Sequence, residues 1–262
     1  MTITAAAVQG LPEIEPGFDL AAAVVAALDA EGPGGPQAGN AVGPLADGDV
    51  IVIAHKAVSK LEGRTRRLSE VQPGPQALEI AAQQCKDPRH VQVVLDEART
   101  VVRVSGGVLI TETRHGFICA NSGVDASNVP GDEVVLMLPL DPDASARALR
   151  ARFRELTGVA PGVIITDSFG RAWRIGQCDV AVGIAGVGPV EDWRGGVDAH
   201  GRELNATVIA VADELAACAD LARRKDGQQP VILVRGAGRH ITTEDGPGAA
   251  ALIREREQDL FR

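Results

Sequence analysis

The segment Asp49-Val50-Ile51-Val52-Ile53-Ala54 is a continuous apolar run that is rich in β-branched residues. A short run of this kind predicts a buried strand. Periodicity and turn signals predict further strands and helices on both sides of it, but the helices do not alternate one for one with the strands. We therefore expect an α+β fold in which helices flank mixed or antiparallel sheets, not a doubly wound parallel sheet. The other predicted strands cover 91–95, 101–104, 108–113, 134–138, 162–166, 180–184 and 231–234, and the predicted helices cover 19–31, 75–84, 143–156, 207–224 and a charged C-terminal stretch.

Domain organisation follows from the chain breakers. Residues 32–44 are rich in Gly and Pro and show no periodicity, which predicts a flexible, exposed insertion. No internal repeat is visible, and the second half contains no clear linker. We expect a single unit over 1–262, built either as one body or as two interleaved lobes.

Composition narrows the class of function. The chain has 262 residues, of which 45% are hydrophobic and 23% charged, which excludes wholesale disorder. Its formal net charge of -9 and its aromatic content of 3%, without any Tyr, argue against a nucleic-acid-binding protein, which needs basic patches and stacking rings. These numbers favour an enzyme that acts on small molecules.

Cysteine usage and apolar runs indicate the compartment. The four cysteines form no CxxC pair, so a zinc or redox motif is not expected. The first residues lack the pattern of a secretory signal, and the apolar run 20–28 is far shorter than the roughly 20 residues that span a bilayer. We expect a cytoplasmic protein with reduced thiols.

Residues 55–64, directly after the first predicted strand, carry the first candidate site. Lys56 and Lys60 lie four residues apart beside Ser59 and Arg64. Ammonium and hydroxyl groups at a strand end suit phosphate oxygens. A solvated basic turn is the alternative interpretation of the same residues.

Residues 119–129 form a second candidate. Asn121, Asp125 and Asn128 lie in a short loop between apolar segments, and oxygen donors of this kind suit Mg²⁺ or Mn²⁺. Asx residues also form ordinary turns, so a purely structural loop stays open.

Residues 166–174 form a third candidate. Asp167 and Ser168 follow an apolar run, and Arg171 and Arg174 come next. The carboxylate and hydroxyl could hold a cation while the two arginines, candidates for anion binding, neutralise an anionic substrate. A helix cap with a salt-bridged turn is the alternative. The sequence contains neither G-x-x-x-x-G-K-[ST] nor G-x-G-x-x-G, so any nucleotide is bound by another scheme.

Taken together, these segments resemble the coenzyme F420-0:γ-glutamyl ligase family, in one consistent order over nearly the whole chain. The resemblance implies a stand-alone ligase unit without the nitroreductase-like domain of fused ligases, and an unusual α+β fold that forms a homodimer. The matching stretches include Gly10-Leu-Pro-Glu-Ile14, Lys56-Ala-Val-Ser-Lys60, Lys86-Asp-Pro-Arg89, His115-Gly-Phe-Ile-Cys-Ala-Asn121, Gly123-Val-Asp-Ala-Ser-Asn-Val129, Leu138-Pro-Leu-Asp-Pro-Asp143 and Thr166-Asp-Ser-Phe-Gly-Arg171.

The resemblance also implies an activity and its residues. The expected reaction joins L-glutamate to F420-0 at the expense of GTP, with Mn²⁺ or Mg²⁺, and then adds a second glutamate through a γ-linkage. Ser168 stands where the family commonly has Thr, and its hydroxyl can still ligate a metal, whereas His55 replaces a usual amide or small polar residue. The implied roles are GTP binding for Leu11, Pro12, Glu13, Ile14, His55, Lys60 and Asn128, metal binding for Asp125, Asp167 and Ser168, and catalysis for Lys60, Asp125 and Asp167.

Two rival functions use the same residues. The carboxylates could serve a metal-dependent phosphohydrolase that acts on a phosphorylated metabolite, or the chain could be a binding protein without turnover. For the ligase, we expect the γ-phosphoryl group of GTP to convert a carboxylate into an acyl phosphate, which the glutamate amine then attacks.

Overall fold

The computed structural model describes residues 2–30, 43–126, 133–224 and 226–259. Most of the predicted insertion 32–44 and the candidate GTP ligand Asn128 lie outside these residues. The described chain contains several sheets with helices packed on them, which confirms the α+β class.

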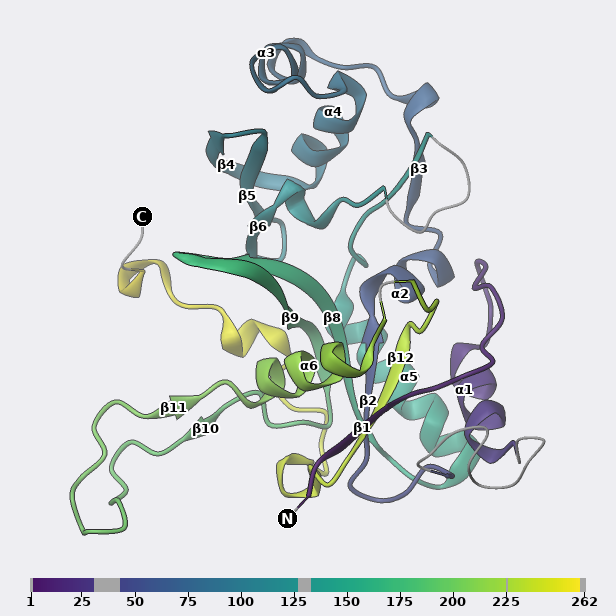
Figure 1. Ribbon diagram of the computed structural model, residues 1–262, viewed down its shortest axis with the longest axis vertical. Coiled ribbons are helices and arrows are strands. Elements are labelled where there is room, and N and C mark those ends of the chain that lie inside the picture. The colour runs from purple at the N-terminus through teal and green to yellow at the C-terminus, as the bar shows by residue number, and fades with distance from the viewer. Residues whose placement is uncertain (1, 31–42, 127–132, 225, 260–262) are drawn as a thin grey trace.

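A five-stranded sheet forms the centre of the molecule (Figure 1). The predicted strand 49–54 lies in its middle as β2, and Val50, Ile51, Val52 and Ile53 are completely buried. β2 is parallel to β8, and the other neighbouring pairs are antiparallel, so the sheet is mixed as predicted. The strand order is β1 (Thr4–Ala7), β12 (Val231–Arg235), β2 (Val50–Ala54), β8 (Gly162–Arg171) and β9 (Arg174–Ala185).

Both faces of this sheet are covered. Ile51 and Ile53 pack toward α1 (Leu20–Asp29) and α5 (Pro142–Thr157), whereas Val50 and Val52 pack toward α6 (Val211–Ala222) on the opposite face. Coverage on two sides explains why β2 is continuously apolar and does not alternate.

The helix ends follow their sequence signals. Asp19 accepts a hydrogen bond from the Ala22 N–H at 3.0 Å and begins α1 as predicted. Gly158 ends α5 in the left-handed conformation, at φ 77°, which glycine adopts without steric cost.

Residues 65–126 and 133–136 form a second region, which we call the inserted region because it lies between β2 and β8 in the sequence. Its core includes Val91, Val94, Leu109 and Val135 and is separate from the two cores of the large sheet. Figure 1 shows it at the top of the molecule. Its elements are β3 (Thr65–Arg67), α3 (Pro75–Gln84), α4 (Pro88–Glu97), β4 (Ala98–Ser105), β5 (Val108–Thr113), β6 (Ile118–Ala120) and β7 (Val134–Leu136).

The predicted strand 91–95 is wrong, because these residues lie inside α4. The β-branched residues suggested a strand, but Asp87 caps the helix through the Arg89 N–H at 2.8 Å and Pro88 occupies its first turn. Val91 and Val94, three residues apart, are both buried in the inserted core, which is the spacing of a helix face.

Two other predicted helices differ in extent. Residues 208–209 of the predicted helix 207–224 form the short strand β11 (Val208–Ile209), and α6 begins only at Val211. The described part of the C-terminal stretch contains 3-10 turns at Ala249–Leu252 and Arg256–Gln258 instead of an α-helix.

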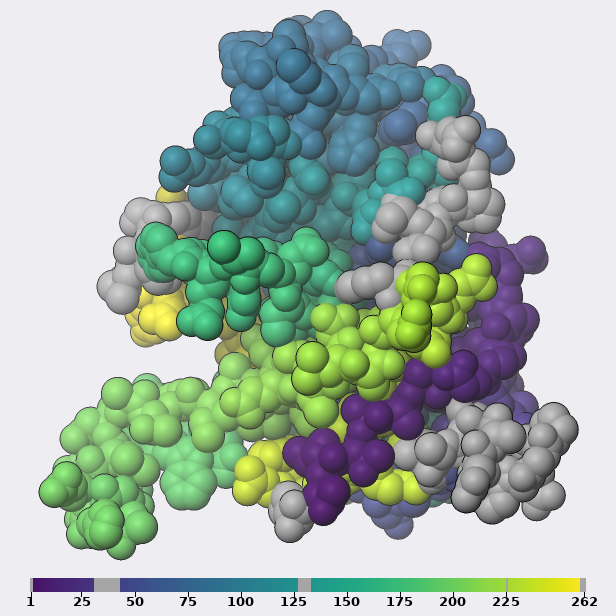
Figure 2. Space-filling model, in the orientation of Figure 1, coloured from purple at the N-terminus to yellow at the C-terminus, as the bar shows by residue number. Residues whose placement is uncertain are grey.

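The remaining short elements connect these parts. α2 (His55–Leu61) directly follows β2, and β10 (Glu191–Asp192) pairs with β11 at the base of an arm that projects from the body (Figure 2). No helix in the described residues is long and apolar enough to cross a membrane. Three further 3-10 turns cover Leu68–Glu70, Asn121–Gly123 and Gly238–His240.

Candidate active site

The parallel pair β2 and β8 brings His55 and Asp167 together. Ala54 pairs with Thr166 in the register of these strands, so the next residue of each chain segment lies beside the other. The His55 Nε2 is 3.3 Å from the Asp167 Oδ1, and the two side chains are 2% and 15% exposed. The His55 Nδ1 lies 3.3 Å from the Ser59 hydroxyl, which fixes the ring from its other side. The predicted segments 55–64 and 166–174 therefore meet at the carboxyl end of β2, where it lies beside β8.

The lysines that follow belong to a helix and not to a solvated turn. α2 places Lys56 and Lys60 one turn apart, with side chains only 24% and 17% exposed. The Lys56 ammonium lies 2.6 Å from the Asp125 carboxylate, and the Lys60 ammonium lies 2.5 Å from the Glu13 carboxylate. Each lysine thus links α2 to a different predicted segment.

Asp125 is held by the inserted region. Asn121 and Ser122 take left-handed backbone conformations, and the Ser122 hydroxyl donates to the Val94 carbonyl at 2.9 Å. The backbone N–H and C=O of Asp125 then pair with Leu136 at 3.0 and 2.8 Å. These bonds fix the loop while the Asp125 side chain stays 37% exposed.

A second polar cluster lies on the α6 face of the hairpin formed by β8 and β9. The buried Asp179 carboxylate accepts hydrogen bonds from the Thr166 hydroxyl at 2.8 Å and the Ser168 hydroxyl at 2.6 Å. The Arg223 guanidinium, just after α6, donates to the same carboxylate at 2.5 Å. Sequence reasoning missed Asp179 and Arg223. The one available signal is the acidic residue directly before the apolar run 180–185, in the same position as Asp49 before β2.

A cavity of about 340 Å³ joins these groups. The sequence-predicted residues Leu11, Pro12, Glu13, Ile14, His55, Lys60, Asp167 and Ser168 all line it, although they come from three distant segments. Asp125 stands next to it through its ion pair with the lining residue Lys56. Its other lining residues are Ala54, Ala57, Thr166, Asp179, Arg223, Arg224, Gln228, Gln229 and Pro230.

Arg171 and Arg174 lie elsewhere. β8 does not end near Asp167 but continues to Arg171, which pairs with Arg174 at the tip of the hairpin. Both side chains are exposed, and neither residue lines the cavity. The Arg171 guanidinium donates to the Ile175 carbonyl at 2.9 Å. Anion binding by these two residues stays a prediction. Neither residue lines the cavity, so the cavity adds no support for it.

Burial changes the acidity of groups near the site. The pKa of the Cys119 thiol is raised to about 12, mainly because burial disfavours the thiolate and also because Asp167 is negatively charged. Burial likewise raises the pKa of Asp213 on α6, although its carboxylate accepts the Ala181 N–H at 2.9 Å. Asp213 thereby holds the backbone of β9 two residues from Asp179.

The donor set suits a hard divalent cation. Asp167 and Ser168 present a carboxylate and a hydroxyl at the cavity wall, and Asp125 adds a second carboxylate beside it. Among the described residues, no group of three or more His, Cys, Asp and Glu side chains is close enough to hold a metal alone. Mg²⁺ and Mn²⁺ are commonly held by one or two carboxylates together with water and substrate phosphates, so these residues fit such an ion.

Comparison with known proteins assigns the family. The family model described as F420-0:Gamma-glutamyl ligase matches residues 10–236. The coenzyme F420:L-glutamate ligase of Methanothermobacter thermautotrophicus is 42% identical over 263 residues, covering 100% of both chains. The Methanopyrus kandleri protein of the same name is 47% identical over 83% of this chain and 87% of its own, and that of Haloarcula marismortui is 42% identical over 98% and 94%. The cavity is built from the segments that carry the resemblance. This chain belongs to the F420-0:gamma-glutamyl ligase family and is a ligase.

Proposed function

We propose that the protein uses GTP to join L-glutamate to F420-0 through an acyl phosphate, and then adds a second glutamate through a γ-linkage. The family and the names of its relatives support a ligase of this substrate pair. One structural observation carries the GTP-dependent form of the proposal. Residues 11–14, His55, Lys60, Asp167 and Ser168 converge on a single cavity that contains both ammonium and carboxylate groups.

In this proposal, the apolar residues of the cavity would contact the nucleoside of GTP, and the cations would contact its phosphates. Leu11, Pro12 and Ile14 offer apolar surface, which suits a nucleoside, and Lys60 offers a compact positive charge, which suits phosphate oxygens. Glu13 holds the Lys60 ammonium in place through their ion pair. Asn128, the remaining proposed contact, lies outside the described residues.

Asp125, Asp167 and Ser168 would hold Mn²⁺ or Mg²⁺. When bound, the ion would neutralise negative charge on the phosphate oxygens of the substrates. The Lys56 ammonium pairs with Asp125, and the His55 ring lies beside Asp167, so consecutive residues of α2 approach the two carboxylates. Ligands for the ion would therefore come from both regions.

In the proposed reaction, a carboxylate oxygen of F420-0 attacks the γ-phosphorus of GTP. The bond between the γ-phosphorus and the bridging oxygen breaks, and GDP leaves. The amine of L-glutamate then attacks the acyl carbon, phosphate leaves with the electron pair of the broken C–O bond, and the amine loses a proton as the amide forms. Lys60 lines the cavity, and its positive charge would stabilise the negative charge that develops during phosphoryl transfer.

We further propose that the protein acts as a cytoplasmic homodimer. The arm that begins with β10 and β11 projects from the body (Figure 2) and exposes Trp193, Val197 and Val208 by 42%, 60% and 43%. Apolar side chains on a projecting segment favour association with another copy of the chain. Light scattering during gel filtration measures the mass in solution; a monomer at micromolar concentration would contradict this part of the proposal.

The decisive experiment incubates the protein with F420-0, L-glutamate, GTP and Mn²⁺ and follows the products by mass spectrometry. We expect F420-0 to gain one and then two glutamyl residues, with one GDP and one phosphate released for each. Parallel reactions replace GTP with ATP or omit glutamate. GTP hydrolysis that requires neither F420-0 nor glutamate would favour the phosphohydrolase, and no adduct in any reaction would overturn the ligase.

A further inference from the structure

Arg223 is a buried cation whose hydrogen-bonding capacity is only partly used. Its side chain is 10% exposed, and one terminal nitrogen donates to the Asp179 carboxylate at 2.5 Å. Its Nε and the other terminal nitrogen are buried and have no hydrogen-bond partner in residues 2–30, 43–126, 133–224 and 226–259. Buried guanidinium groups normally have their donors satisfied, because an unmade hydrogen bond is costly.

Arg150 shows what a structural arginine looks like in the same molecule. Its side chain is 9% exposed, about as buried as that of Arg223. All three of its nitrogens donate, to the carbonyls of Pro161, Thr242 and Thr243 and to the Asp245 carboxylate. Arg150 therefore joins α5 to neighbouring loops, whereas Arg223 keeps donors that the protein itself does not use.

Asp179 fixes the direction in which these donors point. Its carboxylate is 2% exposed and is surrounded by the Thr166 hydroxyl, the Ser168 hydroxyl and the Arg223 guanidinium. The ion pair with Asp179 and the burial of its side chain together restrict the orientations that the Arg223 guanidinium can take. The pair is thus a prearranged group on the cavity wall, on the α6 side of the sheet.

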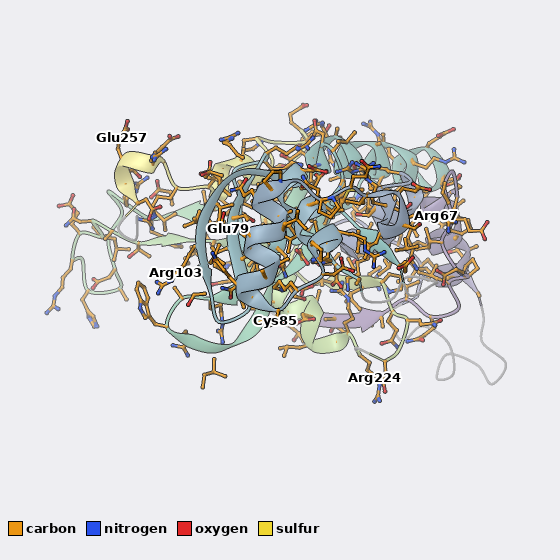
Figure 3. All side chains as sticks on the ribbon, turned by 90° about the horizontal axis from the view of Figure 1, so that it is seen from above. Arg67, Glu79, Cys85, Arg103, Arg224 and Glu257 are labelled. Atoms are coloured by element: carbon orange, nitrogen blue, oxygen red, sulfur yellow. The ribbon has the colours of Figure 1, made fainter. Side chains whose placement is uncertain are left out.

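The adjacent Arg224 also borders the cavity, but its side chain lies in a different environment. Its side chain is 72% exposed, pairs with Asp226 and points away from the body in Figure 3. The turn after α6 therefore directs one arginine into the protein and the other into solvent.

We propose that Arg223 is the binding residue of an oxyanion subsite in this cavity, and that Asp179 is its positioning residue. The inference rests on the proposed function, because the oxyanion it binds belongs to one of that reaction's substrates. The shared chemistry is a carboxylate or phosphate group, which matches the planar, forked donors of a guanidinium. Its source is the triphosphate of GTP, an acidic group of F420-0 or a carboxylate of L-glutamate.

The test compares Arg223→Met and Arg223→Lys with the double variant Asp179→Asn, Arg223→Met. The double variant is needed because removing Arg223 alone leaves the buried Asp179 charge uncompensated, which can destabilise the fold. Arg152→Gln is the matched control, because Arg152 also pairs with carboxylates but lies on α5 outside the cavity. Thermal unfolding is measured for every variant.

The binding of GTP and of L-glutamate is measured separately by calorimetry, and the KM of each of the three substrates is measured in the ligation assay. For Arg223→Met we expect the affinity for one substrate to fall by about 10- to 100-fold, as is typical for the loss of a charged hydrogen bond. Arg223→Lys should recover part of that affinity. The double variant should recover stability but not affinity, and the substrate that is affected identifies the source of the oxyanion.

Two results would overturn the assignment. One is affinity for all three substrates within twofold of the wild type in Arg223→Met, and the other is recovery of affinity in the double variant, which would make the pair purely structural. The wild-type ligation assay tests the proposed function independently. A wild type that does not ligate, but whose binding of GTP or glutamate depends on Arg223, would overturn that function and leave the subsite standing.

Discussion

The large sheet and the inserted region contribute to the site in different ways. Among the described residues, those that line the cavity all belong to the large-sheet part of the chain, and none comes from 65–126 or 133–136. The inserted region instead supplies Asp125, whose carboxylate pairs with the cavity residue Lys56. The difference indicates that the described cavity wall comes from the large-sheet part, and that the proposed metal chemistry requires the two regions to stay correctly docked.

We expect the largest effect from a substitution that removes the charge of Asp167, the carboxylate that the large sheet supplies. Asp167→Asn keeps the shape of the side chain but removes its charge, so we expect the ligation rate to fall by about 10³-fold, in line with the loss of a main electrostatic contribution. The thermal midpoint should change little, because Asp167 lies at the cavity wall. Product formation is followed by mass spectrometry.

Asp125→Asn is the counterpart in the inserted region, and Asp192→Asn on the projecting arm is the control. A rate loss in Asp125→Asn similar to that in Asp167→Asn would show that both regions take part in turnover. Full activity of Asp167→Asn would remove this residue from the proposed metal site.

The next effect concerns stability. Leu109 is fully buried in the inserted core, so Leu109→Ala should lower the free energy of unfolding by about 2–5 kcal/mol. Hydrogen exchange should then increase in α4 and β5, while the amides of β2 and β12 stay protected. Leu233→Ala in the large-sheet core is the matched substitution and should produce the opposite pattern. Equal acceleration throughout the molecule in both variants would show that the two regions unfold as one unit.

A smaller effect is expected where the two regions touch. Lys56→Met removes the ammonium that holds Asp125 but keeps the length of the side chain. Because both members of this pair are partly exposed, we expect a fall in kcat of about tenfold and little change in stability. Lys86→Met, within the inserted region and outside the cavity, should leave kcat unchanged. An unaltered kcat in Lys56→Met would show that Asp125 acts without the ion pair to Lys56.

The smallest effect is a pH dependence. Because the pKa of Cys119 is raised to about 12 in the folded protein, the folded state retains a proton that the unfolded thiol loses near pH 9. The contribution of Cys119 to stability is therefore complete below about pH 9 and is lost as the pH rises toward 12. Urea unfolding at pH 8 and pH 10 should show a larger loss of unfolding free energy between the two pH values for the wild type than for Cys119→Ala.

The burial of Cys119 can also be tested by alkylation. At pH 8, iodoacetamide should modify the exposed Cys85 and spare Cys119; the reverse order would contradict the burial of the Cys119 thiol.

Local signals were sufficient for much of the fold and for part of the site. The apolar run of β2, the Asp19 cap and the Gly158 stop each depend on neighbouring residues, and each is confirmed. The same kind of reasoning was wrong for residues 91–95, where the burial of Val91 and Val94 on one helix face outweighs the preference of valine for strands.

The missed pair Asp179 and Arg223 shows where local signals stop. Its members are 44 residues apart and meet only because β9 and α6 pack on one another. Nothing in the sequence distinguishes Arg223 from an ordinary basic residue near the end of a helix, since neither its burial nor its direction can be read from neighbouring residues. The predicted cavity residues could be found because each belongs to a recognisable segment.

The position of β2 in the sheet has a consequence for the synthesis of the protein. Both of its neighbours come later in the chain, β8 at 162–171 and β12 at 231–235. A nascent chain therefore carries the four apolar, β-branched residues Val50–Ile53 without their native strand partners while the whole inserted region is translated. Unpaired apolar strands are prone to aggregate. Early folding of the inserted region would not protect β2, because this region contains neither of its strand partners. β2 can pair only after the second half of the polypeptide has been synthesised.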